Sequence, residues 1–98
     1  MEANFLQHNP NVPTGRDAFI NVITKIFQKN PRFNTQIQRI YTDGDYVFVH
    51  SFSPLKGSGN AIVDIYRINN NGKIAEHWDV IQSIPSKPEN NNIMFYLK

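Results

Sequence analysis

The sequence predicts an α+β fold in which one helix precedes a curved antiparallel β-sheet. Three observations predict it. Apolar residues recur at helical spacing in residues 14–29, and four later stretches alternate between apolar and polar side chains. Turn-forming Asp-Gly and asparagine-rich segments separate those stretches, an order that is typical of α+β domains. Because 98 residues suffice for one compact domain, we expect a single domain over residues 1–98.

The helix is predicted within "TGRDAFINVITKIFQKNP". Thr14 is expected as the N-cap, because a threonine hydroxyl can accept a backbone N–H of the first turn. The helix is expected to end at Asn30–Pro31, since the residue before a proline avoids helical backbone. Its apolar stripe consists of Phe19, Ile23, Ile26 and Phe27. The preceding "LQHNPN" is expected to be a loop.

Four strands are expected after the helix, at residues 33–41, 46–52, 60–68 and 73–82. The connections "TDGD", "SPLKGSG" and "NNNG" are rich in turn formers, and Asp-Gly suits the positive φ angles of a tight hairpin loop. Short connections of this kind join neighbouring antiparallel strands. We therefore expect a four-stranded antiparallel meander.

The composition excludes several classes of function. The net charge is +2 and the basic residues are scattered, so no nucleic-acid partner is expected. The absence of cysteine excludes disulfides, thiolate zinc sites and cysteine nucleophiles. No apolar run approaches the roughly 20 residues of a membrane span, and the first ten residues do not resemble a signal peptide. We expect a cytoplasmic protein without a membrane partner.

Strand pairing predicts which side chains share a face of the sheet, because successive residues point to opposite faces. One face is expected to combine polar and aromatic side chains, namely Phe48, His50, Asp64, Tyr66, His77 and Asp79. Buried carboxylates are costly unless they are paired, so this combination indicates a small-molecule pocket. The other face is expected to be apolar and covered by a second subunit, with contacts through Val63, Ile65, Trp78 and Val80.

Two interpretations of the polar residues stay open. In an apolar pocket the pKa of Asp79 would rise, so that it could exchange protons near neutral pH, with His77 orienting it or relaying the proton. Alternatively, Asp79, His77 and Asp64 form a structural ion-pair network. No metal is predicted, because the spacing of His8, His50 and His77 matches no ligand motif.

Four stretches in order along the chain, "LQHNPNVPTGRDAF", "GDYVFVHS", "AIVDIYRINNNGKIAEHWDVIQ" and "NNIMF", resemble the SnoaL-like polyketide cyclase family of the nuclear-transport-factor-two-like superfamily. The resemblance implies a cone-shaped sheet around a pocket closed by helices, in proteins that commonly dimerise through the sheet. The family's cyclases use an acidic residue as general acid/base in an aldol ring closure, without metal or cofactor. Asp79 fits that role, with His77 and Asp64 as partners and His8 at the pocket mouth.

Family members usually carry a further helix before "LQHNP", so the pocket is expected to be open or closed by a partner subunit. Two functions follow. The first is a cofactor-independent cyclase or isomerase acting on a hydrophobic carbonyl compound, with Asp79, His77 and Asp64 as catalytic residues. The second is a non-catalytic ligand-binding or dimeric assembly module with a vestigial pocket. The expected ligand contacts are His8, His50, Phe48 and Tyr66.

Overall fold

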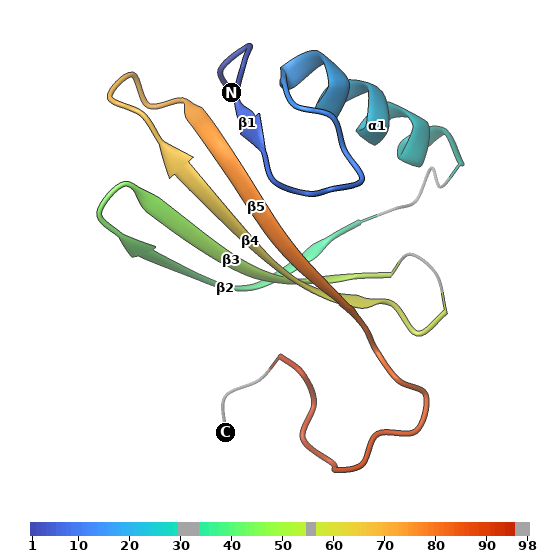
Figure 1. Ribbon diagram of the computed structural model, residues 1–98. Coiled ribbons are helices and arrows are strands. Elements are labelled where there is room, and N and C mark those ends of the chain that lie inside the picture. Colours follow the sequence, from blue (N-terminus) through green and yellow to red (C-terminus); the bar gives the residue numbers. More distant parts are fainter. Residues whose placement is uncertain (30–33, 55–56, 96–98) are drawn as a thin grey trace.

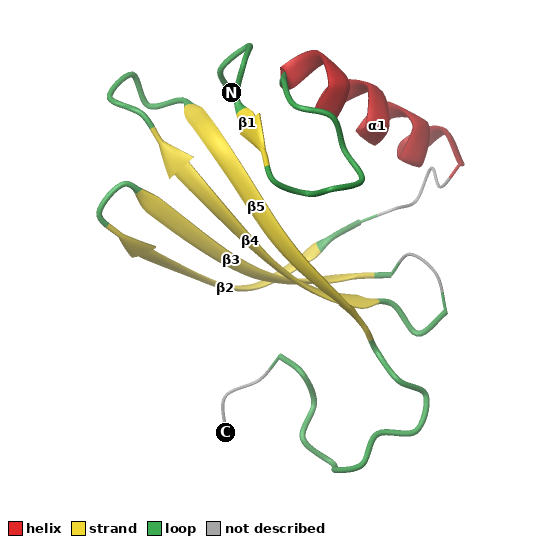
Figure 2. Ribbon diagram, in the orientation of Figure 1, coloured by secondary structure: helices red, strands yellow, loops and turns green. Residues whose placement is uncertain are grey.

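A computed structural model describes residues 1–29, 34–54 and 57–95 as a twisted sheet with a helix on one side (Figures 1 and 2). The sheet contains five strands in the spatial order β1-β5-β4-β3-β2. The α+β class predicted from the sequence is confirmed. The elements are β1 (Leu6–Gln7), α1 (Arg16–Lys29), β2 (Gln36–Asp43), β3 (Tyr46–Ser53), β4 (Asn60–Ile68) and β5 (Ile74–Ser83).

The predicted meander is confirmed for β2 to β5, which pair antiparallel in sequence order. Asp43 pairs with Tyr46 across a two-residue loop, and Gly44 in that loop has a φ of 57°, as the Asp-Gly signal predicts. A β-bulge between Ile37 and Arg39 shifts the register of β2. Ile37 pairs with Ser51 before the bulge, and Arg39 pairs with His50 after it. The bulge therefore inserts one extra residue into β2 between these two pairs.

The segment "LQHNPN" is not simply a loop, which corrects the prediction. Leu6 and Gln7 form β1, which pairs parallel with β5 so that Gln7 lies beside His77. The His8 N–H then donates to the His77 carbonyl at 2.9 Å. A strand of two residues is too short to show an alternating pattern, so no periodic signal marks it.

The start of α1 also differs from the prediction. Thr14 is not the N-cap, because the first intrahelical bond runs from the Phe19 N–H to the Gly15 carbonyl at 3.2 Å, which places Gly15 at that position. The Thr14 Oγ1 instead accepts the Gln7 N–H at 3.3 Å. The helix begins after Gly15, whose φ of 102° suits glycine. The Gly15 N–H donates to the Phe5 carbonyl at 3.1 Å, which ties the helix start to β1. The expected helix end at Asn30–Pro31 lies outside the described residues.

The apolar core is small. Among the described residues, Phe5 and Ala61 are the buried apolar side chains, and α1 buries none of its own. The Phe5 ring meets the Phe19 ring edge-on, with centroids 6.0 Å apart. The apolar side of α1 therefore faces the sheet across a cavity instead of packing tightly against it.

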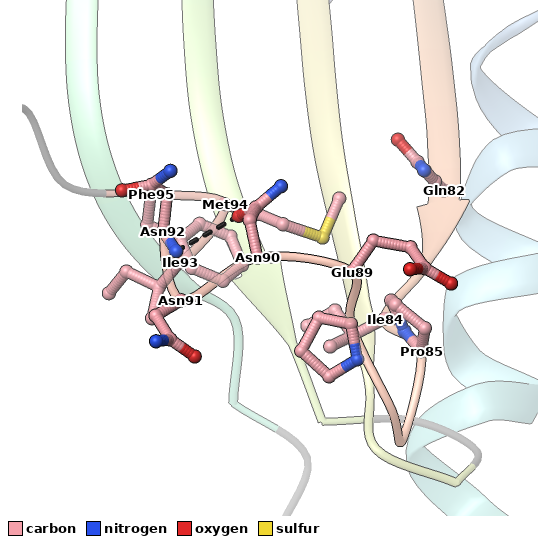
Figure 3. A pocket seen from close by; sticks show the side chains of 11 residues that line it. Gln82, Ile84, Pro85, Glu89, Asn90, Asn91, Asn92, Ile93, Met94 and Phe95 are labelled. Carbon is pink, nitrogen blue, oxygen red and sulfur yellow. Dashed lines mark hydrogen bonds between the residues drawn. The ribbon is translucent and has the colours of Figure 1, made fainter.

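The C-terminal segment, residues 84–95, turns back below the sheet (Figure 1). Its Phe95 ring lies against His50 and Phe52 of β3, with centroid distances of 5.3 and 5.7 Å. The segment encloses a pocket of about 630 Å³ (Figure 3), in which Glu89 is the one charged side chain among the described lining residues. A lone carboxylate has no second ionisable partner among these described residues, so this pocket offers no paired acid–base groups. In the described part of the chain, no helix has the length and apolar character needed to cross a bilayer.

Candidate acid-base site in the cavity beneath the helix

A second cavity, of about 440 Å³, lies between α1 and the sheet. We call the face of the sheet toward this cavity the inner face, and the opposite one the outer face. From the helix, the cavity is lined by Phe19, Val22, Ile23 and Ile26. From the sheet and the segment after β1 it is lined by polar residues, which include Gln7, Asn9, Ser51, Asp64, Tyr66, His77 and Asp79. It is therefore an apolar cup with a polar wall, a composition typical of small-molecule sites.

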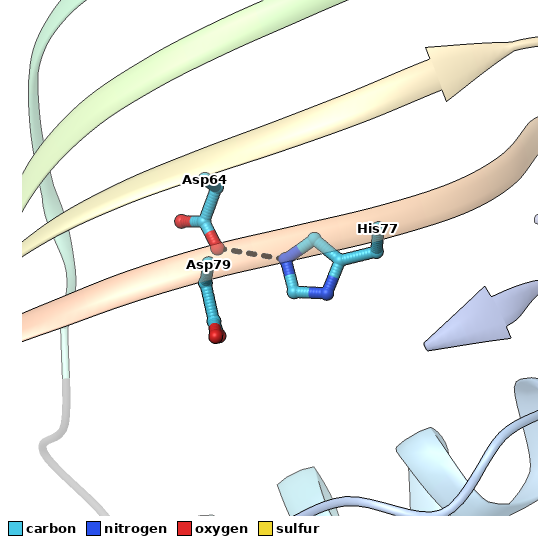
Figure 4. A group of neighbouring side chains, drawn as sticks. All are labelled: Asp64, His77 and Asp79. Carbon is cyan, nitrogen blue, oxygen red and sulfur yellow. Dashed lines mark hydrogen bonds and ion pairs between the residues drawn. The ribbon is translucent and has the colours of Figure 1, made fainter. Parts of the chain in front are cut away.

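The register of β4 and β5 gathers the three predicted catalytic residues. Asp64 pairs with Asp79, and Tyr66 pairs with His77. Because antiparallel partners share a face, all four side chains project from the inner face. The polar atoms of Asp64, His77 and Asp79 lie within 4.8 Å of one another (Figure 4). The predicted convergence of these three residues is found, while their catalytic role stays a prediction.

His77 is held by hydrogen bonds at both ring nitrogens and is 5% exposed. Nε2 lies 2.8 Å from Oδ1 of Asp64, and Nδ1 lies 2.8 Å from Oε1 of Gln7. That Gln7 oxygen also accepts the Asn9 N–H at 3.1 Å, so the backbone fixes the orientation of the amide. Since Oε1 can only accept, Nδ1 carries a proton. One further proton is then shared between Nε2 and the Asp64 carboxyl.

Asp79 is positioned by a second amide. Nδ2 of Asn9 donates to both carboxylate oxygens of Asp79, at 2.9 and 3.0 Å. Oδ1 of Asn9 accepts the Asn11 N–H at 2.9 Å, so this amide is also oriented by the backbone. A carboxylate has about four acceptor positions, and the amide occupies part of them. Asp79 therefore keeps acceptor capacity toward the cavity that it lines.

Tyr66 contributes a neutral hydroxyl. Its ring stacks on His77 with centroids 4.8 Å apart. Burial, and after it the negative charges of Asp64 and Asp79, raise the pKa of the Tyr66 phenol well above its ordinary value. The phenol thus stays protonated and can donate a hydrogen bond into the cavity. The predicted location of Tyr66 on the pocket face agrees with the structure.

The predicted location of Phe48 and His50 on the pocket face is wrong. Phe48 pairs with Ile65, and His50 pairs with Val63, so both project from the outer face. The prediction placed seven residues in the loop after β3, but β3 continues to Ser53 and pairs with Asn60 there. The loop then has an even number of residues, which exchanges the two faces of β3.

His50 consequently belongs to the outer surface near the C-terminal segment. Partial burial, and after it the charge of Arg39 on the neighbouring strand, lower the pKa of His50. A ligand in the cavity would not meet this ring. Val49 and Ser51 occupy the inner-face positions of β3 that were predicted for Phe48 and His50.

His8 is also not at the pocket mouth. Nε2 of His8 lies 2.7 Å from Oε2 of Glu76. The His8 ring stacks on Trp78, with centroids 4.6 Å apart and an interplanar angle of 2°. Both partners belong to the outer face of β5. The residues on either side of His8, Gln7 and Asn9, are the ones that reach the cavity. If "QHN" is treated as a strand, Gln7 and Asn9 point to one face and His8 to the other, and this alternation could have identified them as cavity residues.

The cluster could also supply ligands to a cation. Asp64, His77 and Asp79 offer oxygen and nitrogen atoms at suitable mutual distances. Both nitrogens of His77 are, however, already hydrogen-bonded to Asp64 and Gln7. A cation would have to replace one of these bonds, so the arrangement fits a hydrogen-bonded cluster better than a metal centre. The three histidines do not meet, because His8 and His50 lie on the outer face.

Comparison with protein families agrees with this architecture. The family model of the SnoaL-like polyketide cyclases matches residues 1–89 of the 98-residue chain. The chain belongs to this family. The family assignment predicted from the sequence is thus confirmed, and it indicates a fold that supports cyclase-type or isomerase-type chemistry or ligand binding. A search of curated proteins gave no match to the chain.

The outer-face cluster generates a pH prediction. Arg67 Nε donates to Glu76 Oε1 at 2.8 Å, and this bond, together with the one from His8, lowers the pKa of Glu76. Because the folded-state pKa lies below the unfolded one, the resulting stabilisation is present above the unfolded pKa. It is lost as pH falls through the folded value. We expect Arg67→Met to raise the pKa of Glu76. The free energy of unfolding of this variant should then decrease less than that of the wild type as the pH falls.

Carbon-13 NMR of the Glu76 carboxyl and urea unfolding at several pH values measure both effects. Arg16→Met is the matched control, since Arg16 makes an exposed ion pair with Asp17 on α1 at 3.7 Å. An unchanged Glu76 pKa in the Arg67 variant would show that the hydrogen bond does not hold the carboxylate charged.

Proposed function

We propose that the protein binds a small hydrophobic carbonyl compound in the cavity and transfers a proton at the carbon beside the carbonyl, as a cyclase or isomerase does. The observation that carries the proposal is the Asp79 carboxylate, fixed by Asn9 at 2.9 and 3.0 Å beside the proton-sharing His77–Asp64 pair. Together with the protonated Tyr66 hydroxyl, the cavity therefore offers a base and a hydrogen-bond donor within one apolar space. Membership of the SnoaL-like family supports the same class of chemistry.

The proposed reaction needs no group beyond these side chains. Asp79 removes the proton from the carbon beside the carbonyl, and the C–H electron pair forms an enolate with its charge on the carbonyl oxygen. The Tyr66 hydroxyl donates a hydrogen bond to that oxygen. In an isomerase, the proton on Asp79 returns to a different carbon. In a cyclase, the enolate carbon attacks a second carbonyl, and the resulting alkoxide takes the proton from Asp79.

The apolar wall has a defined role in this proposal. Val22, Ile23 and Ile26 of α1 and Ile62 of β4 line the cavity around the polar residues. Binding of a hydrophobic ligand removes water from this space, which strengthens hydrogen bonds to the developing oxygen charge. General acid–base groups placed in this way accelerate proton transfer by about 10²–10⁴-fold.

A second candidate function is a ligand-binding module without catalysis. One observation favours it: Gln7 and Asn9 satisfy His77 and Asp79 without any ligand. The polar cluster is therefore complete as a structural network. In that case the cavity would bind a hydrophobic molecule, and the acidic residues would hold β1 against the sheet.

Exchange of Asp79 by asparagine separates the two functions. Acetophenone in deuterated water is the probe, because proton removal beside its carbonyl replaces methyl hydrogen by deuterium, which NMR detects. We expect the wild type to accelerate this exchange and Asp79→Asn to reduce the acceleration about 10²-fold or more, because the base is lost. The asparagine has nearly the same shape and can still accept from Asn9, so the fold should persist.

Asp43→Asn is the control, since Asp43 lies exposed at the β2–β3 hairpin. If acetophenone binds and exchanges equally fast with wild type and Asp79→Asn, Asp79 is not the base. Binding without any exchange would favour the non-catalytic module.

We further propose a homodimer through the outer face, with contacts through Val63, Ile65, Trp78 and Val80. Val63 and Val80 pair across β4 and β5 and are 38% and 67% exposed, so an apolar patch lies open there. His8 covers one side of Trp78, which leaves a smaller part of the indole for a partner. The proposed binding partners are thus a small hydrophobic ligand and a second copy of the chain. The cytoplasmic location stays a prediction.

The dimer proposal predicts that Val80→Asp produces a monomer, because a charge would be buried in the interface. Light scattering over a range of concentrations measures the mass, and circular dichroism verifies the fold. Ile20→Asp is the matched control, since Ile20 is 52% exposed on α1, away from the patch. A wild-type protein that is monomeric at every concentration would contradict the proposal.

A further inference from the structure

Ser51 is the one polar side chain in the described residues that is buried without a hydrogen-bond partner. It is 1% exposed and lines the cavity from the inner face of β3. Ser53 and Asn60, which lie near it on the inner face, have interactions of their own. A buried hydroxyl without a partner costs free energy, so its position inside a cavity indicates a partner that enters that cavity.

The position of Ser51 relative to the acid–base cluster follows from the register. Val49, Asp64 and Asp79 form one row across the three strands, and Ser51 lies in the next row with Ile62 and Ile81. Two residues along a strand correspond to about 7 Å, and two strand spacings to about 10 Å. Ser51 and Asp79 are therefore separated by about 12 Å between their backbones, with apolar side chains of the second row beside Ser51.

We propose that Ser51 is a specificity-determining residue that binds an oxygen group at the end of the ligand remote from its reacting carbonyl. This inference rests on the proposed function and narrows its ligand class. The ligand would carry oxygen groups at both ends of an apolar body. The side chains of Ser51 and Asp79 and their hydrogen bonds to the ligand occupy part of the distance between the two backbones. The remaining space fits a ligand of about one aromatic ring with its substituents.

The affinities of two probes test the role of Ser51. Para-hydroxyacetophenone and para-methylacetophenone have a similar size, but only the first has an oxygen opposite its carbonyl. We expect the wild type to bind the hydroxy compound about three- to tenfold more tightly, which corresponds to one hydrogen bond to a buried group. Ser51→Ala should abolish this preference. Ser83→Ala, at the exposed end of β5, should retain it. NMR titration of the backbone amides measures each affinity.

The outcomes separate the two proposals. Equal affinity of the wild type for both probes, or a preference that persists in Ser51→Ala, overturns the role of Ser51 and leaves the proposed function standing. Failure of both probes to bind contradicts the carbonyl-binding function and the Ser51 proposal with it.

Stability gives a test of Ser51 that needs no ligand. Replacing an unpartnered buried hydroxyl by a methyl group should leave the urea midpoint of unfolding unchanged or raise it. A lower midpoint for Ser51→Ala than for wild type would show that the hydroxyl supports the fold, and it would overturn the proposal.

Discussion

The site depends on the parallel pairing of β1 with β5. This contact involves two residues of β1, yet it places Gln7 beside His77 and brings Asn9 to Asp79. Both amides are oriented by backbone N–H groups of the same segment, from Asn9 and Asn11. These backbone bonds therefore determine that Gln7 accepts from His77 and that Asn9 donates to Asp79. Without β1, the buried His77 and the half-buried Asp79 would each lose a hydrogen-bond partner, at a cost typical of unsatisfied polar groups.

The same segment also decides the shape of the cavity. Phe5 is buried next to β1, and its contacts with Phe19 and Gly15 fix where α1 starts. The helix is consequently anchored at its N-terminal end and extends across the inner face with its apolar side chains facing the cavity. The small core and the cavity both result from this placement of α1, which is anchored at one end and does not pack tightly against the sheet. Binding of an apolar molecule would supply part of the burial that the fold itself does not achieve.

Charge is distributed differently on the two faces. On the inner face, the His77–Asp64 pair and Asp79 lie together. Burial, and after it the negative charges of Asp64 and Asp79, raise the pKa of the Tyr66 phenol and keep it protonated. On the outer face, Arg67 and His8 both bond to Glu76, which stays charged. Adjacent residues of β5 thus alternate between the two clusters. A ligand in the cavity would interact with the inner cluster alone, while a partner subunit would meet the outer one.

The sequence predicted α1, the four long strands and the inner-face positions on β4 and β5, because their periodic patterns extend over many residues. It also predicted that Asp64, His77 and Asp79 share a face, because either possible pairing of Asp64, with His77 or with Asp79, leaves these residues on the same side. The actual pairing with Asp79 could not be predicted, because a β-bulge between Arg67 and Ile68 shifts the register. It could not predict the faces of β3, because one residue added to the end of that strand exchanges Phe48 and His50 with Val49 and Ser51. It could not predict Gln7 and Asn9 either, because their positions depend on a pairing between residues 70 positions apart.

Proton-detected nitrogen-15 NMR of the His77 ring tests the central claim most directly, because it reports which ring nitrogen carries a proton. The structure predicts a protonated Nδ1 that donates to Gln7, together with an Nε2 that shares a proton with Asp64. In Gln7→Leu, which removes the acceptor at similar size, the Nδ1 signal should move away from its wild-type position. A wild-type ring with an unprotonated Nδ1 would contradict the account, because the Gln7 amide could not then position His77.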